Sequence, residues 1–483
     1  MIRRFFKDSF IYSISNILTA GFGVIMMPIY TRTLSQSDYG VIDMAGIFFA
    51  FATIILGFEM PQAISKFYSK YKGDEQIDFL RTCISFSVLT TFSVALLSIL
   101  FCGKLSLLLF NSNAYKFVIV IAAIGYFFSK LFSNFTIVMR NSNKVSLVAV
   151  LSIVSSILTL GFTIWFVVDC KLGIIGVFYG NLISSMSIAL VVIFKYPKFF
   201  KFKISKVYLL TILKFTTPLV FSGLSIAFIN YTDRIIIDKY VSLSEVGIYG
   251  VASRISSIVS LVLFGFTSAI VPLTYSSAER NDSPYKIEKI FSIFLGFSAI
   301  LILIVSFFSN FIILTFTNST YLRASNVVTI LLLLNLSSSV GYFFPGLFIK
   351  GKTKIVALNY FFIAMLNLLL NLIFTPKYGM SGSSISSLIS TLIGMVVTVY
   401  FSQKFYHIPI NINKYFRFIV AFIFMIILNF FLDFFVINLF LSACIKITCI
   451  ILFTFYLFIA NFFSYTEFLN EIGSFFYRLK LKS

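Results

Sequence analysis

Apolar residues fill most of this chain in stretches of about 20 residues, separated by short polar connections. A helix that crosses a bilayer needs about 20 mainly apolar residues, whereas the strands of a membrane barrel have about ten residues of alternating polarity. The pattern therefore predicts an all-α polytopic membrane protein with about 14 transmembrane helices. We place these helices at residues 10–30, 40–62, 82–103, 116–138, 145–168, 173–194, 208–231, 247–271, 290–316, 326–349, 355–375, 380–402, 415–437 and 440–463.

The composition agrees with this assignment and excludes a soluble protein. Hydrophobic residues make up 59% of the chain, charged residues only 11%, and the mean hydropathy is +1.00. Soluble domains carry roughly 25% charged residues. The first apolar run begins near Phe10, lacks a small-residue cleavage site and is followed by many more spans, so we expect a retained helix and no signal peptide.

The net charge of +21 follows the membrane topology. Lys and Arg gather in alternate connections, which the positive-inside rule explains if both termini are cytoplasmic. The connections on the other side then hold few cations: Arg32, Lys104, Lys116, Lys171, Arg234, Lys239, Arg323 and, depending on the helix boundary, Lys377. The excess charge thus points to the headgroups of a lipid bilayer as its partner, with no nucleic acid. The densest stretch, residues 196–206, is interpreted as a topology anchor in preference to a specific lipid site.

A segment near the start of the chain is echoed about two hundred residues later. LSQSDYGVIDMA (34–45) matches VSLSEVGIYGVA (241–252). The matched pairs are Ser35/Ser242, Ser37/Ser244, Asp38/Glu245, Gly40/Gly247 and Ala45/Ala252. Glycine permits tight turns, and a carboxylate near the start of a helix caps it and suits its dipole. We therefore interpret the motif as a turn that caps the following helix.

Two further echoes occur in the same order. LGIIG (172–176) matches YGMSG (378–382), which pairs Gly173 with Gly379, and MRNSNKV (139–145) matches IKGKTKI (349–355). Ordered echoes predict two six-helix lobes, and an even number of helices makes them parallel repeats, as in transporters that bind substrate between their halves. The predicted organisation is residues 1–206 for the first lobe, 207–405 for the second, and 406–483 for two additional helices and a cytoplasmic tail.

Charged side chains at membrane depth are costly, so each is a functional candidate. Three cations are candidate substrate-binding residues: Lys130 and Arg254 within the fourth and eighth helices, and Lys214 at the start of the seventh. Asp43 and Glu59, at opposite ends of the second helix, are candidate ion-coupling residues.

Simpler roles remain open for some of these charges. Lys214 would also be explained by snorkelling to the cytoplasmic surface. Glu59 would also be explained by pairing with Lys66. Asp233 and Arg234 are expected to pair locally at the outer end of the seventh helix, outside the transport path.

Catalytic, metal and cofactor sites are not expected. The five cysteines form no CxxC pair, and His407 is the only histidine. GLFIKGKT (346–353) has the letters of a phosphate-binding loop, but that loop must follow a strand and open a helix in a nucleotide domain. Here it follows a transmembrane helix, so we predict no ATP binding.

PIYTRTLSQSDYGVIDM (28–44) with EMPQAISKFYSKY (59–71) resembles the start of the bacterial polysaccharide flippases. KFTTPLVFSGLSIAFINYTDRIIIDKYVSLSEVGIYGVASRIS (214–256) is similar to the start of their second half. The resemblance covers essentially the whole chain and places it in the multidrug, oligosaccharidyl-lipid and polysaccharide exporter superfamily, which implies a fold of two lobes.

This resemblance implies a function. It implies translocation of an undecaprenyl-diphosphate-linked oligosaccharide, an O-antigen or capsule repeat unit, across the bacterial inner membrane by alternating access. A polysaccharide polymerase and a chain-length regulator are the protein partners it suggests. A cavity with cationic walls would replace the hydration that the diphosphate loses. The sugar, the coupling ion and the oligomeric state stay open.

Two other functional classes remain as alternatives. A drug or small-metabolite exporter of the same fold would share the helix pattern. A membrane polysaccharide polymerase is less favoured, because such enzymes need a sizeable outer loop or an acidic cluster, and the outer connections offer only Asp233, Asp238 and Glu245 without a catalytic grouping.

Overall fold

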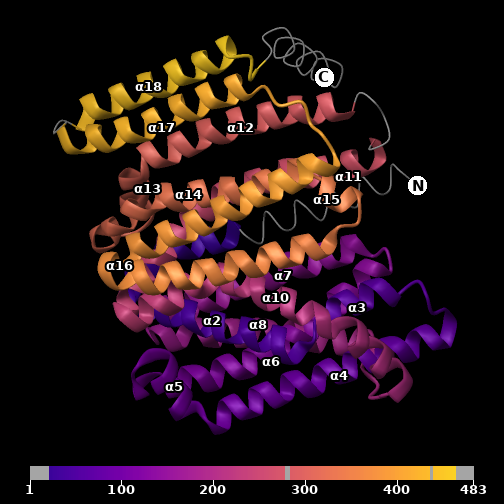
Figure 1. Ribbon diagram of the computed structural model, residues 1–483. Helices are drawn as coiled ribbons and strands as arrows, with labels where there is room; N and C mark the ends of the chain where they lie inside the picture. Colours follow the sequence, from indigo (N-terminus) through magenta and orange to yellow (C-terminus); the bar gives the residue numbers. More distant parts are fainter. Residues whose placement is uncertain (1–20, 278–282, 436–438, 464–483) are drawn as a thin grey trace, which may run out of the picture. The chain divides into compact units, whose positions relative to one another are not determined.

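The computed structural model describes residues 21–277, 283–435 and 439–463, and these residues are helical with no strand among them (Figure 1). Within this described part, 12 helices are long and apolar enough to cross a membrane. They correspond to 13 of the 14 predicted spans, because α16 (Thr353–Phe405) contains two of them. The remaining span, residues 10–30, lies mainly outside the described residues. The all-α polytopic fold is therefore confirmed.

The chain forms two compact units. One comprises residues 1–254 and 360–387, and the other comprises residues 255–359 and 388–483. The three boundaries fall inside long helices, one in α11 (Leu243–Ser277) and two in α16. The lobes predicted from the internal repeat, residues 1–206 and 207–405, are a different division of the chain, and they remain a prediction.

The first unit contains most of the first half of the chain, in which residues 21–33 are helical. Its other helices are α2 (Gln36–Gly57), α3 (Met60–Phe67), α4 (Gly73–Leu100), α5 (Cys102–Phe110), η1 (Asn113–Tyr115), α6 (Lys116–Asn141), α7 (Val145–Ile164), η2 (Trp165–Asp169), α8 (Ile174–Lys195), α9 (Pro197–Phe200), α10 (Lys206–Tyr240) and the first part of α11. Helix α6 packs against α4 and α8, and α7 packs against α8.

The second unit contains the rest of α11 and the end segments of α16. Its other helices are α12 (Ser283–Phe307), α13 (Ser309–Phe316), η3 (Ser319–Ala324), α14 (Ser325–Val340), η4 (Gly341–Phe343), α15 (Gly346–Ile349), α17 (Ile412–Phe435) and α18 (Leu439–Ile459). The two helices beyond the repeat, α17 and α18, lie side by side next to α12 (Figure 1).

Large apolar side chains cover the outside of the helices. Phe194 and Phe440 are each 79% exposed and Leu108 is 75% exposed. Soluble monomers rarely expose apolar surface on this scale, whereas lipid tails cover it without cost. The chain is a multi-pass membrane protein.

The second predicted span, residues 40–62, ends earlier than expected. Helix α2 stops at Gly57, and Phe58 and Glu59 both adopt left-handed backbone angles before α3 begins at Met60. Pro61 explains the break, because proline is accepted in the first turn of a helix and not in its interior. Glu59 therefore lies in the turn between two helices and not at the end of one.

The echoed segments have the same local structure. Ser35 and Asp38 form a capping box at the start of α2, and the side chain of Ser242 accepts a hydrogen bond from the backbone of Glu245 at the start of α11. A helix cap is therefore present at both positions, made by serine, and at the first position also by the Asp38 carboxylate. The expectation that the glycines form turns is wrong, because Gly40 lies inside α2 and Gly247 inside α11.

The glycine echo is equally close. Gly173 has φ 57° and ψ −137°, and Gly379 has φ 58° and ψ −138°, a conformation that only glycine adopts readily. This turn bends the chain between α7 and α8, and the same turn divides α16 into its two predicted spans. The duplication read from the sequence is thus visible in the backbone.

Candidate functional site

A cavity of about 480 Å³ lies within the first unit. Its volume falls in the range of small-molecule binding sites, roughly 300–1,000 Å³. The described residues that line it come from residues 21–33, α2, α6, α7, α8 and α11: Phe22, Gly23, Met26, Tyr30, Ile42, Ala45, Gly46, Phe49, Ala122, Gly125, Tyr126, Ser129, Ser155, Ser156, Thr159, Leu160, Val177, Phe178, Asn181 and Arg254.

Aromatic rings form one part of the wall. Phe49 of α2 and Tyr126 of α6 are stacked, with ring centroids 4.7 Å apart and planes 21° apart. The hydroxyl groups of Tyr126 and Thr53 are hydrogen-bonded at 3.0 Å, which fixes the Tyr126 ring. The cavity therefore presents a rigid aromatic surface.

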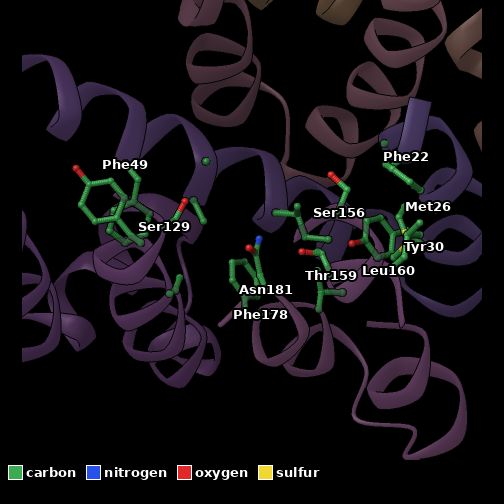
Figure 2. Close-up of a pocket in the computed structure, with 18 of the residues that line it drawn as sticks. Phe22, Met26, Tyr30, Phe49, Ser129, Ser156, Thr159, Leu160, Phe178 and Asn181 are labelled. Carbon is green, nitrogen blue, oxygen red and sulfur yellow. The ribbon is translucent and has the colours of Figure 1, made fainter. Parts of the chain in front are cut away.

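Neutral polar groups form another part. Ser155, Ser156 and Thr159 lie on one face of α7 by helical spacing, and Asn181 extends from α8. Figure 2 shows the Asn181 amide between Phe49 and Tyr30 in that view. Hydroxyl and amide groups beside aromatic rings can bind sugars, because sugars offer hydroxyl groups at their edges and C–H groups on their faces.

Arg254 supplies the charge at this cavity. Its guanidinium group lies 3.5 Å from the Asp43 carboxylate and 5.0 Å from the centre of the Tyr39 ring. Asp43 also lies 3.5 Å from Arg234 of α10. One carboxylate of α2 thus pairs with an arginine from each of two other helices.

Arg234 is held by further partners. It lies 3.8 Å from Asp233 and donates a hydrogen bond of 2.7 Å to Ser253. Asp233 also accepts a hydrogen bond from Tyr249. The predicted local pair of Asp233 and Arg234 is confirmed, but its link to Asp43 joins it to the same charge cluster as Arg254. We call Asp43, Asp233, Arg234 and Arg254 the arginine–aspartate cluster.

Glycines allow α2 and α11 to approach this closely. A Cβ atom at Gly40 would overlap with the Leu243 carbonyl oxygen, and one at Gly247 would overlap with the Gln36 carbonyl oxygen. Gln36 and Leu243 occupy the same position in the two echoed segments, so the contacts are reciprocal. Such close approach of helix backbones requires small residues.

Gly250 has a direct bearing on the charge cluster. A Cβ atom there would overlap with the Asp43 carboxylate. The glycines of the echo therefore bring the two segments into contact and make room for Asp43.

Lys130 and Glu59 lie elsewhere in the same unit. Their charges attract each other, and Lys130 lies 5.6 Å from the centre of the Tyr126 ring. Lys130 is not among the described residues that line the cavity, although Tyr126 is. Glu59 lies against α10, where a Cβ atom at Gly223 would be 2.7 Å from its carboxylate oxygen. Lys130 is the cation whose charge acts on Glu59, and Lys66 lies over the Phe215 ring, 3.7 Å from its centre.

The five predicted site residues are therefore distributed over separate places. Arg254 and Asp43 come together beside the cavity, and the charges of Lys130 and Glu59 interact with each other elsewhere in the unit. Lys214 is exposed on α10, one turn before Pro218, and is not among the described residues that line the cavity.

Sequence reasoning missed several functional candidates. The Ser155, Ser156, Thr159 and Asn181 set was detectable as hydroxyl and amide residues inside apolar runs. Lys446 of α18 was detectable as a lone cation in such a run. It is buried, and its ammonium group donates a hydrogen bond of 2.8 Å to the Phe307 carbonyl at the end of α12. A cation at a helix C-terminus is stabilising, so Lys446 fastens α18 to α12.

Comparisons with known proteins agree with this architecture. A family model described as polysaccharide biosynthesis protein matches residues 5–278. An uncharacterised membrane protein of Methanocaldococcus jannaschii is 23% identical over 428 residues, which cover 81% of this chain and 82% of that protein. An uncharacterised membrane protein of Haemophilus influenzae is 23% identical over 292 residues, covering 58% of this chain and 67% of that protein.

Solved structures share the fold. The lipid II flippase MurJ in its inward closed conformation matches with a TM-score of 0.74 and 19% identity, over 92% of this chain and 97% of that chain. An inward-facing multidrug transporter of the MATE family matches with a TM-score of 0.63 and 14% identity, over 81% of this chain and 94% of that chain. The chain has the fold of flippases and transporters.

Proposed function

The chain belongs to the polysaccharide biosynthesis protein family, and we propose that it translocates an undecaprenyl-diphosphate-linked oligosaccharide across the bacterial inner membrane. The substrate would be an O-antigen or capsule repeat unit. The observation that carries the proposal is the cavity in which an arginine stands beside aromatic, hydroxyl and amide groups. In a substrate with phosphate next to sugar, the phosphate would pair with the arginine and the sugar would pack against the aromatic, hydroxyl and amide groups.

The charge of Arg254 supports a phosphate ligand. A guanidinium group binds phosphate oxygens in a planar, two-bond geometry, and such charge-assisted bonds are about twice as strong as neutral ones. In a low-dielectric surrounding, this contact would replace hydration that the diphosphate loses on leaving water.

The remaining site residues have narrower proposed roles. Lys130 would act next to the cavity through Tyr126, and Lys214 would meet the substrate at the cytoplasmic end of α10. Glu59 is the candidate for ion coupling, because its carboxylate lies in a strained turn beside Lys130. Asp43, the other acidic candidate, is held by two arginines.

The proposed transport cycle uses the internal repeat. The two lobes would alternate access to the cavity while both termini remain cytoplasmic, and the lipid tail would stay in the bilayer. A polysaccharide polymerase and a chain-length regulator would then use the product on the outer side.

The main alternative is export of a drug or small metabolite by the same fold. The stacked rings of Phe49 and Tyr126 would suit a flat aromatic compound. Arg254 argues against the cationic compounds that such exporters often carry, because like charges repel in a low-dielectric cavity. A substrate competition assay would distinguish the two classes.

The test is a reconstituted flipping assay. The protein is placed in vesicles that carry a fluorescent polyprenyl-diphosphate-linked sugar, and the fraction of label accessible to an external quencher is followed over time. We expect transfer between leaflets without a change in the mass of the lipid. Arg254→Ala should slow transfer, whereas Arg140→Ala, an exposed arginine outside the cavity, should not. Equal rates in protein-free vesicles would contradict the proposal, and a change in mass would indicate an enzyme.

A further inference from the structure

We propose that Asp43 is the resident counter-ion of Arg254, which the phosphate groups of the substrate displace, so that this carboxylate selects strongly anionic headgroups. The inference rests on the proposed function and adds a specificity-determining residue to it. It also gives Asp43 a role different from ion coupling.

The geometry shows which partner can be exchanged. Asp43 has one carboxylate oxygen 3.5 Å from Arg254 and the other 3.5 Å from Arg234. Strong pairs of this kind are about 2.7–2.9 Å long, so neither contact is optimal. A phosphate that approached Arg254 with ideal geometry would form the better bond.

Exposure distinguishes the two arginines. The Arg254 side chain is 27% exposed and lines the cavity, whereas the Arg234 side chain is 14% exposed and also binds Asp233 and Ser253. Arg254 can therefore meet a ligand while Arg234 stays with the protein. Asp43 keeps Arg234 after the exchange, so no buried carboxylate is left without a cation, which would be costly.

The balance of charges in this cluster makes the site selective for anionic substrates. The arginine–aspartate cluster contains two carboxylates and two guanidinium groups, so it is neutral before substrate binds. A neutral sugar offers nothing to replace the Asp43 contact of Arg254, and a cation cannot pair with its guanidinium group. A diphosphate supplies at least as much negative charge as the carboxylate it displaces. Sugars alone are therefore rejected even though the cavity walls suit them.

The exchange also has a structural consequence. Asp43 belongs to α2 and Arg254 to α11, so their ion pair links these two helices two residues beyond the second echoed segment. Substrate binding would remove this tie while the glycine contacts between the same helices remain. The α2–α11 contact is thereby weakened at one point when the anion arrives.

Binding of farnesyl diphosphate to the purified full chain in lipid nanodiscs tests the inference. Removal of the competing carboxylate in Asp43→Asn should lower the dissociation constant about fivefold, and Arg254→Ala should raise it. The matched control is Asp233→Asn, which removes the same charge from the same cluster but lies against Arg234 and Tyr249. This control should change the dissociation constant by less than about twofold. Farnesol, which has the same tail without phosphate, should not respond to any of the variants.

Each outcome separates the inference from the proposed function. Weaker or unchanged binding in Asp43→Asn, with binding that still depends on Arg254, would overturn the counter-ion role and leave the proposed function intact. Equal gains in Asp43→Asn and Asp233→Asn would show a general charge effect and overturn the inference as well. If the unaltered protein does not bind farnesyl diphosphate, both the inference and the diphosphate part of the proposed function fail. Thermal unfolding of each variant in the same nanodiscs verifies that it is folded.

Discussion

The two echoed segments, residues 34–45 and 241–252, share a backbone arrangement but differ in the side chains that they place at their contact. Both begin with a serine cap, and both use a glycine to let the other segment approach. At one equivalent position, however, the first segment has Asp43 and the second has Gly250. The carboxylate of one copy occupies the space that the other copy leaves open.

This difference shows how a duplicated fold acquires a single charged site. Two carboxylates at this contact would repel each other, and two glycines would leave Arg234 and Arg254 without their shared partner. Retaining Gly40 and Gly247 preserves the close packing of α2 and α11, while the change at one position provides the carboxylate. The cavity-lining Arg254 lies on α11, two residues beyond the second segment, and its carboxylate partner Asp43 lies in the first segment.

The largest expected effect comes from removing the guanidinium group of Arg254, which lines the cavity. Arg254→Ala should reduce the flipping rate about ten- to hundredfold, because one charge-assisted contact to phosphate is lost. Lys130→Ala should have a smaller effect, since Lys130 is not among the described residues that line the cavity. The vesicle flipping assay measures both, and an equal loss in the two variants would place Lys130 in the substrate path as well.

A swap between the two copies tests whether they are equivalent at this contact. Asp43→Gly and Gly250→Asp should each impair flipping, and the double variant should recover part of the activity because the cluster regains one carboxylate. The expected coupling between the two changes is about 1–3 kcal/mol in a double-mutant cycle of flipping rates. Strictly additive losses would mean that the two positions do not share one site.

The reciprocal glycine contacts should respond alike. Gly40→Ala and Gly247→Ala should each destabilise the protein by about 1–3 kcal/mol, because backbone atoms of the other helix cannot move aside for a methyl group. Gly265→Ala is the matched control on α11, where a Cβ atom would meet nothing within 4 Å. Thermal unfolding in detergent measures all three, and a loss in the control comparable with the others would contradict the packing argument.

The echoed turns should show a smaller, purely conformational effect. Gly173→Ala and Gly379→Ala should each cost about 1 kcal/mol or slightly more, because both glycines have positive φ and have room for a methyl group. The same unfolding assay applies. A cost confined to one of the two positions would show that the turns are not equivalent.

The smallest effect is expected for Lys214→Ala. This side chain is exposed on α10, and a surface substitution usually changes stability by less than about 0.5 kcal/mol. Flipping rates in vesicles provide the second measurement. A marked loss of flipping without a loss of stability would show that Lys214 contributes more to substrate binding than its exposed position indicates.

Much of the fold could be predicted because a bilayer imposes a simple rule on sequence. Backbone groups in hydrocarbon must be hydrogen-bonded within the chain, so each apolar run of sufficient length is a helix. Boundaries were less certain where a run continued past the end of its helix, as at Phe58 and Glu59, since hydropathy does not register a left-handed turn.

The candidate site was less accessible to sequence reasoning. The cost of charge in a membrane identified Arg254, Lys130, Asp43 and Glu59 as residues to examine. It did not indicate that Arg254 lines a cavity and Lys130 does not, nor that Arg234 joins Asp43. The serines and threonine of α7 escaped attention because a single hydroxyl is inexpensive in a helix, where it can bond to the backbone one turn earlier.

The sequence by itself determined the membrane class, the positions of most helices and the duplication, because each depends on local composition or on similarity between segments. Only the tertiary structure decided which charges meet and which face the cavity, because the partners of Asp43 lie about two hundred residues away and on different helices. Electrostatic pairing depends on distances between atoms, and those distances are set by how the helices pack.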